Sequence, residues 1–216
     1  KQLIQSYGVK TPIVAVSNGI DLSKYKKDPK KEEVFRKHFN IQEGEKVVLC
    51  AGLYFRRKGI EDFVEVARRM PDVRFIWLGS INKWLIPRAI RRLVEKDHPS
   101  NVEFPGYFKG AVFQGAMTGA DAFFFPSYEE TEGIVVLEAL AGHQHVVLRD
   151  IPVYHGWVDQ ESAELCHSVD EFVDSLEKVL SGQVDKRDAG DRVAQSRSID
   201  LVADQLVKAY QHVLEM

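Results

Sequence analysis

Two acidic residues, Glu130 and Glu138, flank a glycine, Gly133, at the start of a strongly apolar stretch. If that stretch is a helix, the first backbone N–H groups, those of Gly133, Ile134 and Val135, are free to bind a phosphate. The carboxylates can accept hydrogen bonds from sugar hydroxyls. Because helical side chains lean toward the helix N-terminus, we expect Glu138 to point back to the opening that Glu130 borders. The segment predicts a site that binds phosphate and sugar together.

The same acids have a structural interpretation as well. Glu130 could be an acid that is favoured by the dipole at the helix start. Glu138 is the one charge in an otherwise apolar helix, where an ionised carboxylate is costly without a partner, and it could belong to a buried ion pair. The cluster alone therefore does not decide between a ligand site and local stabilisation.

A second segment, residues 52–59, follows a short apolar run and carries three consecutive cations, Arg56, Arg57 and Lys58, after Gly52. Lysine binds phosphate as a point charge, and arginine can contact two of its oxygens at once. The alternative is a solvated basic loop. The spacing is not that of a phosphate-binding Walker loop, and the chain lacks Gly-x-Gly-x-x-Gly, which disfavours nucleoside-triphosphate hydrolysis and dinucleotide oxidoreductase chemistry.

A third segment, Pro105-Gly106-Tyr107-Phe108, places two aromatic residues after another apolar run. Gly106 permits a close backbone approach, and an aromatic pair can border a flat ring such as a nucleobase. An aromatic residue after a strand also commonly belongs to the core. The segment supports base binding only together with the other two.

The elements that must position these loops follow from hydrophobic patterning. Short apolar runs alternate with longer helical patterns, which predicts an α/β fold: a Rossmann-like, mostly parallel sheet with helices on both faces. Ligands bind such sheets beyond the carboxyl ends of the strands, where all three loops would lie. We expect strands over residues 13–16, 46–51, 73–78, 102–104, 122–125, 145–148 and 164–166, and helices over 32–39, 60–70, 87–96, 111–118, 135–141 and 169–180.

Residues 1–182 are predicted to form this nucleotide-sugar-binding domain, with a short N-terminal lead-in, and residues 183–216 a helical extension. Apolar residues from Leu201 to Leu214 recur at helical spacing, so the chain should end in a long helix that packs back on the domain. The chain begins with Lys1 in a stretch that reads like the middle of a longer polypeptide. We therefore expect a fragment.

Composition narrows the cellular setting. The 216 residues carry a net charge of −3, which gives no reason to expect nucleic-acid binding. The two cysteines, Cys50 and Cys166, do not form a disulfide framework, and a reducing cytoplasm is expected. No apolar run is long enough to span a bilayer. No metal site is expected, since the chain has no Asp-x-Asp and His143 and His145 lack further ligands nearby.

The ordered set of motifs resembles the C-terminal, donor-binding half of retaining GT-B glycosyltransferases of the family-four type. Glu130, Gly133 and Glu138 match the family's Glu-x7-Glu signature with its internal glycine. The resemblance also covers Ser17-Asn18-Gly19-Ile20-Asp21, Gly52 with Lys58-Gly59, Gly106 and Ala120-Asp121-Ala122 before Pro126-Ser127. It extends over about residues 13 to 182 and implies a GT-B half without its N-terminal acceptor domain.

The resemblance implies a role for each matching residue. Lys58, with Arg57, would hold the donor diphosphate and support catalysis. Glu130 would contact the transferred hexose and also support catalysis, and Glu138 would bind the ribose hydroxyls. The backbone near Phe108 would meet the base, and the amides of Ile134 and Val135 would reach sugar and phosphate. The family also implies independence of metals and of any cofactor beyond the nucleotide-sugar substrate.

Within that group, segments such as 56–63 and 125–138 look like bacterial diacylglycerol glucosyltransferases, which use UDP-glucose. This implies glucosyl transfer to a lipid hydroxyl with retention of anomeric configuration, and an isolated fragment that is inactive. Two positions depart from the family. Leu53 stands where many members have arginine, and Gly142-His143-Gln144-His145 replaces Gly-x-Pro, which puts that turn's geometry in question.

A lipid acceptor would bring the protein to the inner face of the cell membrane as a peripheral protein. Residues 84–93 combine Trp84 and Leu85 with three arginines, as an interfacial helix would, although a core-packed helix with a solvated basic face fits equally. The expected partners are thus a nucleotide-sugar, the missing domain, an anionic membrane surface and a lipid. A nucleotide-sugar 2-epimerase, a transferase with a sugar or protein acceptor, and a non-catalytic binding domain remain alternatives.

Overall fold

A computed structural model describes residues 2–214 and contains a six-stranded, wholly parallel sheet. The spatial order is β3-β2-β1-β4-β5-β6, so the chain reverses direction across the sheet between β1 and β4. This confirms the predicted Rossmann-like α/β architecture. The strands are β1 Val47–Ala51, β2 Arg74–Leu78, β3 Val102–Gly106, β4 Ala122–Phe125, β5 Val146–Arg149 and β6 Glu164–Cys166.

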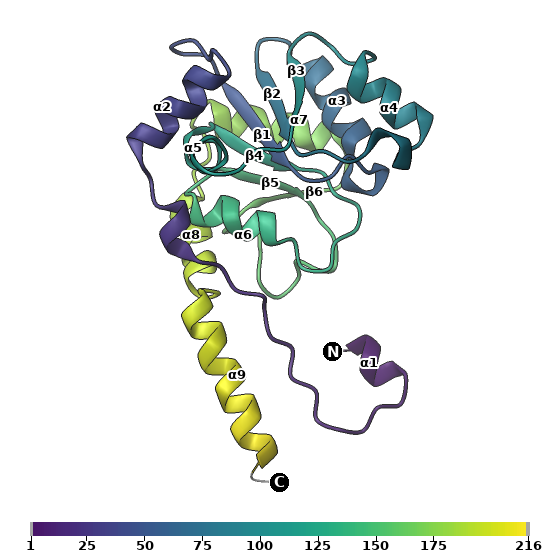
Figure 1. The fold of residues 1–216 in the computed structure, drawn as a ribbon, viewed down its shortest axis with the longest axis vertical. Helices are drawn as coiled ribbons and strands as arrows, with labels where there is room; N and C mark the ends of the chain where they lie inside the picture. Colours follow the sequence, from purple (N-terminus) through teal and green to yellow (C-terminus); the bar gives the residue numbers. More distant parts are fainter. Residues whose placement is uncertain (1, 215–216) are drawn as a thin grey trace.

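Helices cover both faces of the sheet (Figure 1). One layer contains α3 Ile60–Arg69, α4 Arg88–Glu95 and α7 Val169–Leu180, and the other contains α2 Pro29–His38, α5 Ala111–Gly119, α6 Ile134–Ala141 and α8 Arg187–Gln195. Because both faces are covered, every residue of β1, β4 and β5 is buried, which explains why these strands are apolar rather than alternating, apart from Arg149 at the end of β5.

The predicted strand at residues 13–16 is wrong. The segment is extended but pairs with no strand, and Val14 is 62% exposed. The chain joins the folded body from Ser17 onward, where Ser17 and Asn18 donate to Glu132. At Ile20 the N–H donates to the carbonyl of Arg197, and the carbonyl accepts from the N–H of Ile199. A β-branched run favours an extended backbone, but a strand also needs a neighbour to pair with.

The terminal helix α9, Ile199–Leu214, is confirmed as a long helix, but it does not pack back on the domain. It projects away from the sheet, as does the N-terminal lead-in that begins with α1, Gln2–Ser6 (Figure 1). Val202 is the one buried residue of α9, and the apolar stripe beyond it is exposed: Leu206, Val207, Tyr210, Val213 and Leu214. Helical spacing therefore predicted the helix correctly, while its packing partner is not among residues 2–214.

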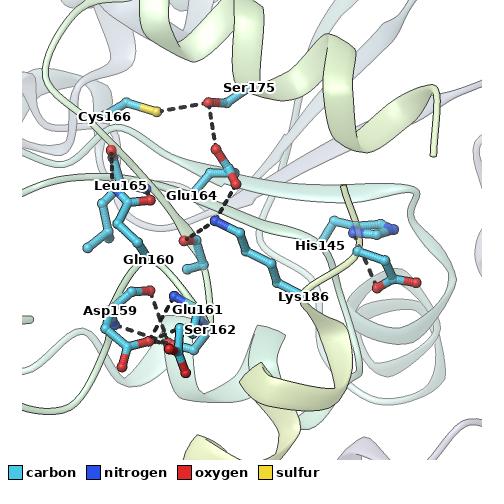
Figure 2. A network of polar contacts seen from close by, with 12 residues as sticks. His145, Asp159, Gln160, Glu161, Ser162, Glu164, Leu165, Cys166, Ser175 and Lys186 are labelled. Carbon is cyan, nitrogen blue, oxygen red and sulfur yellow. Dashed lines mark hydrogen bonds and ion pairs between the residues drawn. The ribbon is translucent and has the colours of Figure 1, made fainter. Parts of the chain in front are cut away.

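The short edge strand β6 is joined to the following helices by side chains (Figure 2). Glu164 pairs with Lys186, just before α8, and accepts a hydrogen bond from Ser175 of α7 at 3.1 Å. Lys186 also donates to the carbonyl of Ala163 at 3.2 Å. Cys166 lies against Ser175, and burial raises the pKa of its thiol to about 11, so the thiol stays protonated at neutral pH.

Two short 3-10 helices matter for the site and a third for the surface: η1 Leu22–Tyr25, η2 Arg56–Lys58 and η3 Lys83–Leu85. The turn at 142–145, where the sequence departs from the family pattern, still connects α6 to β5, with His143 in the left-handed region at φ 58°. Among residues 2–214, no helix is both long and apolar enough to cross a bilayer.

Candidate functional site

A cavity of about 340 Å³ opens at the carboxyl ends of β1, β2 and β4, where the strand order reverses. Parallel sheets bind their ligands at this switch point. Eight of the nine predicted binding residues line it, the exception being Glu138. The full lining is Ala51, Gly52, Leu53, Arg57, Lys58, Leu78, Gly79, Tyr107, Phe108, Phe113, Phe125, Glu130, Gly133, Ile134 and Val135.

Lys58 and Glu130 form an ion pair at 2.5 Å in the wall of this cavity. Lys58 comes from η2, after β1, and Glu130 from the loop after β4, so the pair joins two loops that are 72 residues apart. Their side chains are only 13% and 8% exposed, and the Lys58 ammonium lies 5.4 Å from the centre of the Phe125 ring. Partial burial strengthens the attraction between the charges, but it also penalises either charge left alone.

The basic loop is divided between the cavity and the outside. Arg57 lines the cavity and donates to the carbonyl of Glu129 at 3.1 Å. The Arg57 carbonyl in turn accepts from the N–H of Tyr128 at 2.8 Å and from the Ser127 hydroxyl at 3.2 Å. Arg56 points away and pairs with Glu61 on α3. Arg57 and Lys58 are therefore the two cations of this loop that can meet a ligand in the cavity.

Two glycines let these loops approach each other. Gly59 has a φ of +77°, and a Cβ there would lie 2.2 Å from the carbonyl oxygen of Pro126. Gly133 has a φ of +83°, and a Cβ there would lie 2.9 Å from the ring of Tyr154. Both positions combine a left-handed backbone with a contact that excludes any side chain. Gly133 also caps α6, whose first residues, Ile134 and Val135, border the cavity.

Phe108 and Tyr107 form the other end of the cavity. The Phe108 ring packs edge-on against His38 at 5.0 Å and Phe39 at 5.6 Å between centroids, which fixes its orientation. Tyr107 is 70% exposed. A partly buried ring beside an exposed one offers an apolar border for a flat ligand group.

Glu138 is the predicted residue that the structure does not bring to the cavity. Its carboxylate accepts a hydrogen bond from the Tyr25 hydroxyl of η1 at 2.5 Å. Burial raises the pKa of Glu138, and this outweighs the hydrogen bond from Tyr25 and the nearby charge of Lys24, which both lower it. The expectation that Glu130 and Glu138 converge on one opening is not met here, and the ribose-binding role of Glu138 stays a prediction.

Seven lining residues were not among the predicted binding residues. Five of them lie in predicted strands or in the loop segments singled out from the sequence: Ala51, Leu53, Leu78, Tyr107 and Phe125. The other two, Gly79 and Phe113, were not indicated as part of a site. Gly79 directly follows β2, so the rule about the carboxyl ends of strands applied to it as well. At Gly79 a Cβ would lie 1.9 Å from the carbonyl oxygen of Gly52, so the absence of a side chain lets the backbones after β1 and β2 approach closely. Phe113 lies in α5, away from any strand end, and no motif indicated it.

Glu132 is a further acid of the loop between β4 and α6, residues 126–133, and it was not among the predicted site residues. It accepts from the hydroxyl of Ser17 and from the backbone and side-chain N–H groups of Asn18, and Arg197 lies 3.5 Å away. Burial opposes ionisation, but these hydrogen bonds and the charge of Arg197 lower the pKa of Glu132. The lead-in and the segment before α9 are therefore both joined to the loop that carries Glu130.

Arg149, at the end of β5, contacts the loop between β4 and α6 at Pro126 and Tyr128. It is 8% exposed and donates to the carbonyls of Pro126 at 3.0 Å and His167 at 3.2 Å. It also pairs with Asp62 of α3, which accepts a hydrogen bond from the Tyr128 hydroxyl at 2.6 Å. The guanidinium lies 3.9 Å from the centre of the Tyr128 ring, a cation–π contact.

A larger cavity, about 450 Å³, lies at the opposite, amino-terminal end of the strands, beside Lys46, Asp121 and His145. None of the predicted site residues lines it. Because parallel sheets bind ligands at the carboxyl ends of their strands, the smaller cavity is the candidate site.

Removing either member of the Lys58–Glu130 pair should strand the other charge. We expect Lys58→Met and Glu130→Gln each to lower the free energy of unfolding by roughly 3 kcal/mol, and the double variant to lose less than the two single losses combined. Urea unfolding measures this. As a control, Lys37→Met removes the exposed pair with Glu33 and should change stability little. Additive losses at 58 and 130 would contradict the coupling.

Glu138→Gln should stabilise the protein in a pH-dependent way. The pKa of Glu138 is raised in the folded state, so its protonated form stabilises the folded protein at low pH. This contribution to the free energy of unfolding is lost as pH rises through the folded-state pKa. We expect the variant to melt at a higher temperature than the wild type at pH 7, with the gain vanishing below about pH 4.5, the ordinary carboxyl value. Scanning calorimetry across pH measures it. The exposed Glu161→Gln is the control, and an equal gain at all pH values would refute this.

The comparisons with known proteins agree with this fold. The chain is 49% identical over 219 residues to the processive diacylglycerol alpha-glucosyltransferase of Acholeplasma laidlawii, covering 100% of this chain and 66% of that protein. It is 28% identical over 145 residues to the alpha-galactosylglucosyldiacylglycerol synthase of Streptococcus pneumoniae, covering 66% of this chain and 39% of the relative. The chain thus spans less than two thirds of the length of each of these relatives.

Among solved structures, sucrose-phosphate synthase of Thermosynechococcus elongatus superposes with a TM-score of 0.84 at 20% identity, over 99% of this chain and 56% of that one. Anabaena HepE in complex with UDP-glucose gives 0.78 at 16%, over 91% and 57%. These likenesses concern the fold. The model of the family described as "Glycosyl transferases group 1" matches residues 31–196. With a match over most of the chain and a GT-B-type half domain, the protein belongs to the group 1 glycosyltransferases.

Proposed function

We propose that this chain is the donor-binding half of a retaining glucosyltransferase that moves glucose from UDP-glucose to diacylglycerol. The observation that carries the proposal is the cavity at the switch point, where cations, helix-start amides, a carboxylate and aromatic rings line one space. These are the groups that a diphosphate, a sugar and a base require. The Acholeplasma laidlawii relative and the UDP-glucose complex of Anabaena HepE support the choice of acceptor and donor.

In this proposal the diphosphate lies near Lys58 and Arg57, with the amides of Ile134 and Val135 directed at its oxygens. Gly52 lets the ligand approach the end of β1. The base borders Phe108, and Glu130 contacts the hexose. Glu138 keeps its proposed role toward the ribose, which requires the ligand to extend past the cavity toward η1, because Glu138 does not line the cavity in the free protein.

The chemistry that this half supplies is stabilisation of the leaving group. When the bond between the anomeric carbon and the diphosphate breaks, negative charge grows on the phosphate oxygens. In this proposal Lys58, Arg57 and the first amides of α6 oppose that charge, after Lys58 has exchanged Glu130 for the phosphate. Electrostatic stabilisation of a developing charge is a large source of rate enhancement. The proposal includes no metal and no cofactor beyond the nucleotide-sugar.

The acceptor pocket is assigned to a part of the polypeptide outside this sequence, since the chain covers 66% of the Acholeplasma relative. We therefore propose that residues 1–216 bind the donor weakly and transfer no sugar alone. Residues 1–182 form the donor domain in this scheme. Residues 183–216 form its helical extension, although α8 packs on α6 within the same body, with Gly190 against Leu140.

Membrane contact is proposed through η3 and α4. Trp84 and Leu85 are 77% and 70% exposed, while Ile86 and Ile90 are buried against the core. α4 is packed on the domain, while the turn before it presents an aromatic and an aliphatic side chain outward, which supports the proposed membrane contact. Arg91 lies 5.4 Å from the centre of the Trp84 ring, so a cation accompanies the exposed apolar group.

Calorimetric titration of the chain with UDP-glucose, GDP-glucose and ADP-glucose tests the site. We expect the UDP-sugar to bind and Lys58→Ala to weaken its binding at least tenfold, because a direct charge on the diphosphate is lost. Lys178→Ala, an exposed lysine on α7, should bind like the wild type. In the complete enzyme, Lys58→Ala should lower turnover by about 10² to 10³. Turnover within about threefold of the wild type would refute the role of Lys58.

Co-sedimentation with vesicles tests the membrane surface. We expect the chain to bind vesicles that contain anionic phosphatidylglycerol more than neutral phosphatidylcholine vesicles, and Trp84→Ser/Leu85→Ser to reduce that binding at least several-fold by removing apolar insertion. Exposed Val34→Ser on α2 is a matched control that should not change it. Binding that is indifferent to anionic lipid would remove the membrane role of this half.

A further inference from the structure

Tyr154 is a fully buried tyrosine whose hydroxyl has no hydrogen-bond partner. It lies in the turn after β5 and is 0% exposed. Its oxygen is one of four buried side-chain N or O atoms without a partner among residues 2–214. The other three belong to Glu32, Gln144 and His145, which line the cavity at the amino ends of the strands. A buried donor left unmet destabilises the folded state, so its presence calls for an explanation.

The hydroxyl lies against Gly133, at the end of the loop between β4 and α6. A Cβ built at Gly133 would be 3.2 Å from the Tyr154 oxygen and 2.9 Å from its ring. Gly133 lines the cavity and follows Glu130 by three residues. The ring is fixed in place by an edge-on contact with Trp157 at 5.6 Å and by the backbone hydrogen bond of Tyr154 to Ile151. The unmet hydroxyl is therefore held at the back wall of the site, beside the segment that begins with Glu130.

Tyr154 is a neutral donor in this position. Burial raises the pKa of its phenol above the ordinary value, and the negative charge of Glu130 raises it further. The phenol thus keeps its proton and remains a hydrogen-bond donor. That carboxylate is paired with Lys58 in the free protein. A carboxylate has about four acceptor positions, so Glu130 can accept a further hydrogen bond.

We propose that Tyr154 is a positioning residue that donates to Glu130 when a donor diphosphate draws Lys58 away from it. The inference rests on the proposed function, because it requires a diphosphate beside Lys58. Without Lys58, Glu130 would be a buried carboxylate that keeps only its contact with the hexose, and its remaining acceptor positions would be unmet, which is unfavourable. The Tyr154 hydroxyl supplies the missing hydrogen bond and keeps the 130–133 loop in its place behind the sugar. The cost of leaving it unmet in the free protein is thereby recovered in the complex.

Tyr154→Phe tests this, since it removes the hydroxyl alone and keeps the buried ring. We expect the variant to melt at the same temperature as the wild type or higher, because an unmet donor is removed. Its affinity for UDP-glucose should fall about tenfold, the effect of one hydrogen bond to a charged group. Thermal unfolding and calorimetric titration of the 216-residue chain measure both.

The control is Tyr54→Phe, at a tyrosine that is 5% exposed and whose oxygen accepts from the Gly106 N–H at 3.3 Å. That variant should lose stability, because it removes a hydrogen bond that is already formed in the free protein. A second comparison uses Glu130→Ala, in which Tyr154 has no carboxylate to hold. In that background Tyr154→Phe should change the affinity by less than about twofold, whereas a purely structural hydroxyl would have the same effect in both backgrounds.

Each outcome is decisive. Lower affinity with unchanged or higher stability, absent in the Glu130→Ala background, supports the inference. Unchanged affinity of Tyr154→Phe overturns it, and so does a fall in stability, which would show that the hydroxyl is already satisfied in the free protein. If the wild-type chain itself binds no UDP-glucose or UDP, the proposed function fails instead, and the two failures are told apart by that first titration.

Discussion

The site depends on one constraint of the sheet: β1 and β4 are parallel neighbours although more than 70 residues separate them in the chain. Their carboxyl ends emerge side by side, so the loop with Lys58 and the loop with Glu130 meet above them. The glycine at 59 allows the contact, because its Cα faces the carbonyl of Pro126 at a distance that excludes a side chain. The cavity follows from this pairing, with β2 adding its floor at Gly79.

The pairing places opposite charges in a partly buried wall. Lys58 and Glu130 neutralise each other in the free protein, and the attraction between them offsets the free-energy cost of removing each charge from water. A diphosphate that binds there competes with a carboxylate for the ammonium group. In the function proposed above, donor binding would be an exchange of partners, in which the phosphate replaces Glu130 on Lys58 and Glu130 takes a further hydrogen-bond donor. Two buried side chains contact the loop with Glu130: Tyr154, with its unmet hydroxyl, lies against Gly133, and Arg149 donates to the carbonyl of Pro126.

The loop with Glu130 also contacts the two segments that lead to the projecting ends of the chain. Glu132 joins the lead-in at Ser17 and Asn18 to the segment before α9 at Arg197, and the Ile20–Ser198 bridge holds those two segments together. Movement of either segment would therefore act on the residue next but one to Glu130. From this junction α9 extends away from the sheet (Figure 1), and the apolar residues along it are exposed.

The sequence by itself determined the architecture and most of the site. Apolar runs without alternation fixed a parallel sheet covered on both faces, and the strand-end rule located Gly52, Lys58, Glu130 and Gly133, because these properties are local and repeat along the chain. Only the tertiary structure decided that Glu138 faces Tyr25 rather than the cavity, because a side chain's partner depends on which element packs across from it. It also decided that residues 13–16 pair with nothing and that α9 leaves the domain, since pairing and docking require a neighbour that periodicity cannot name.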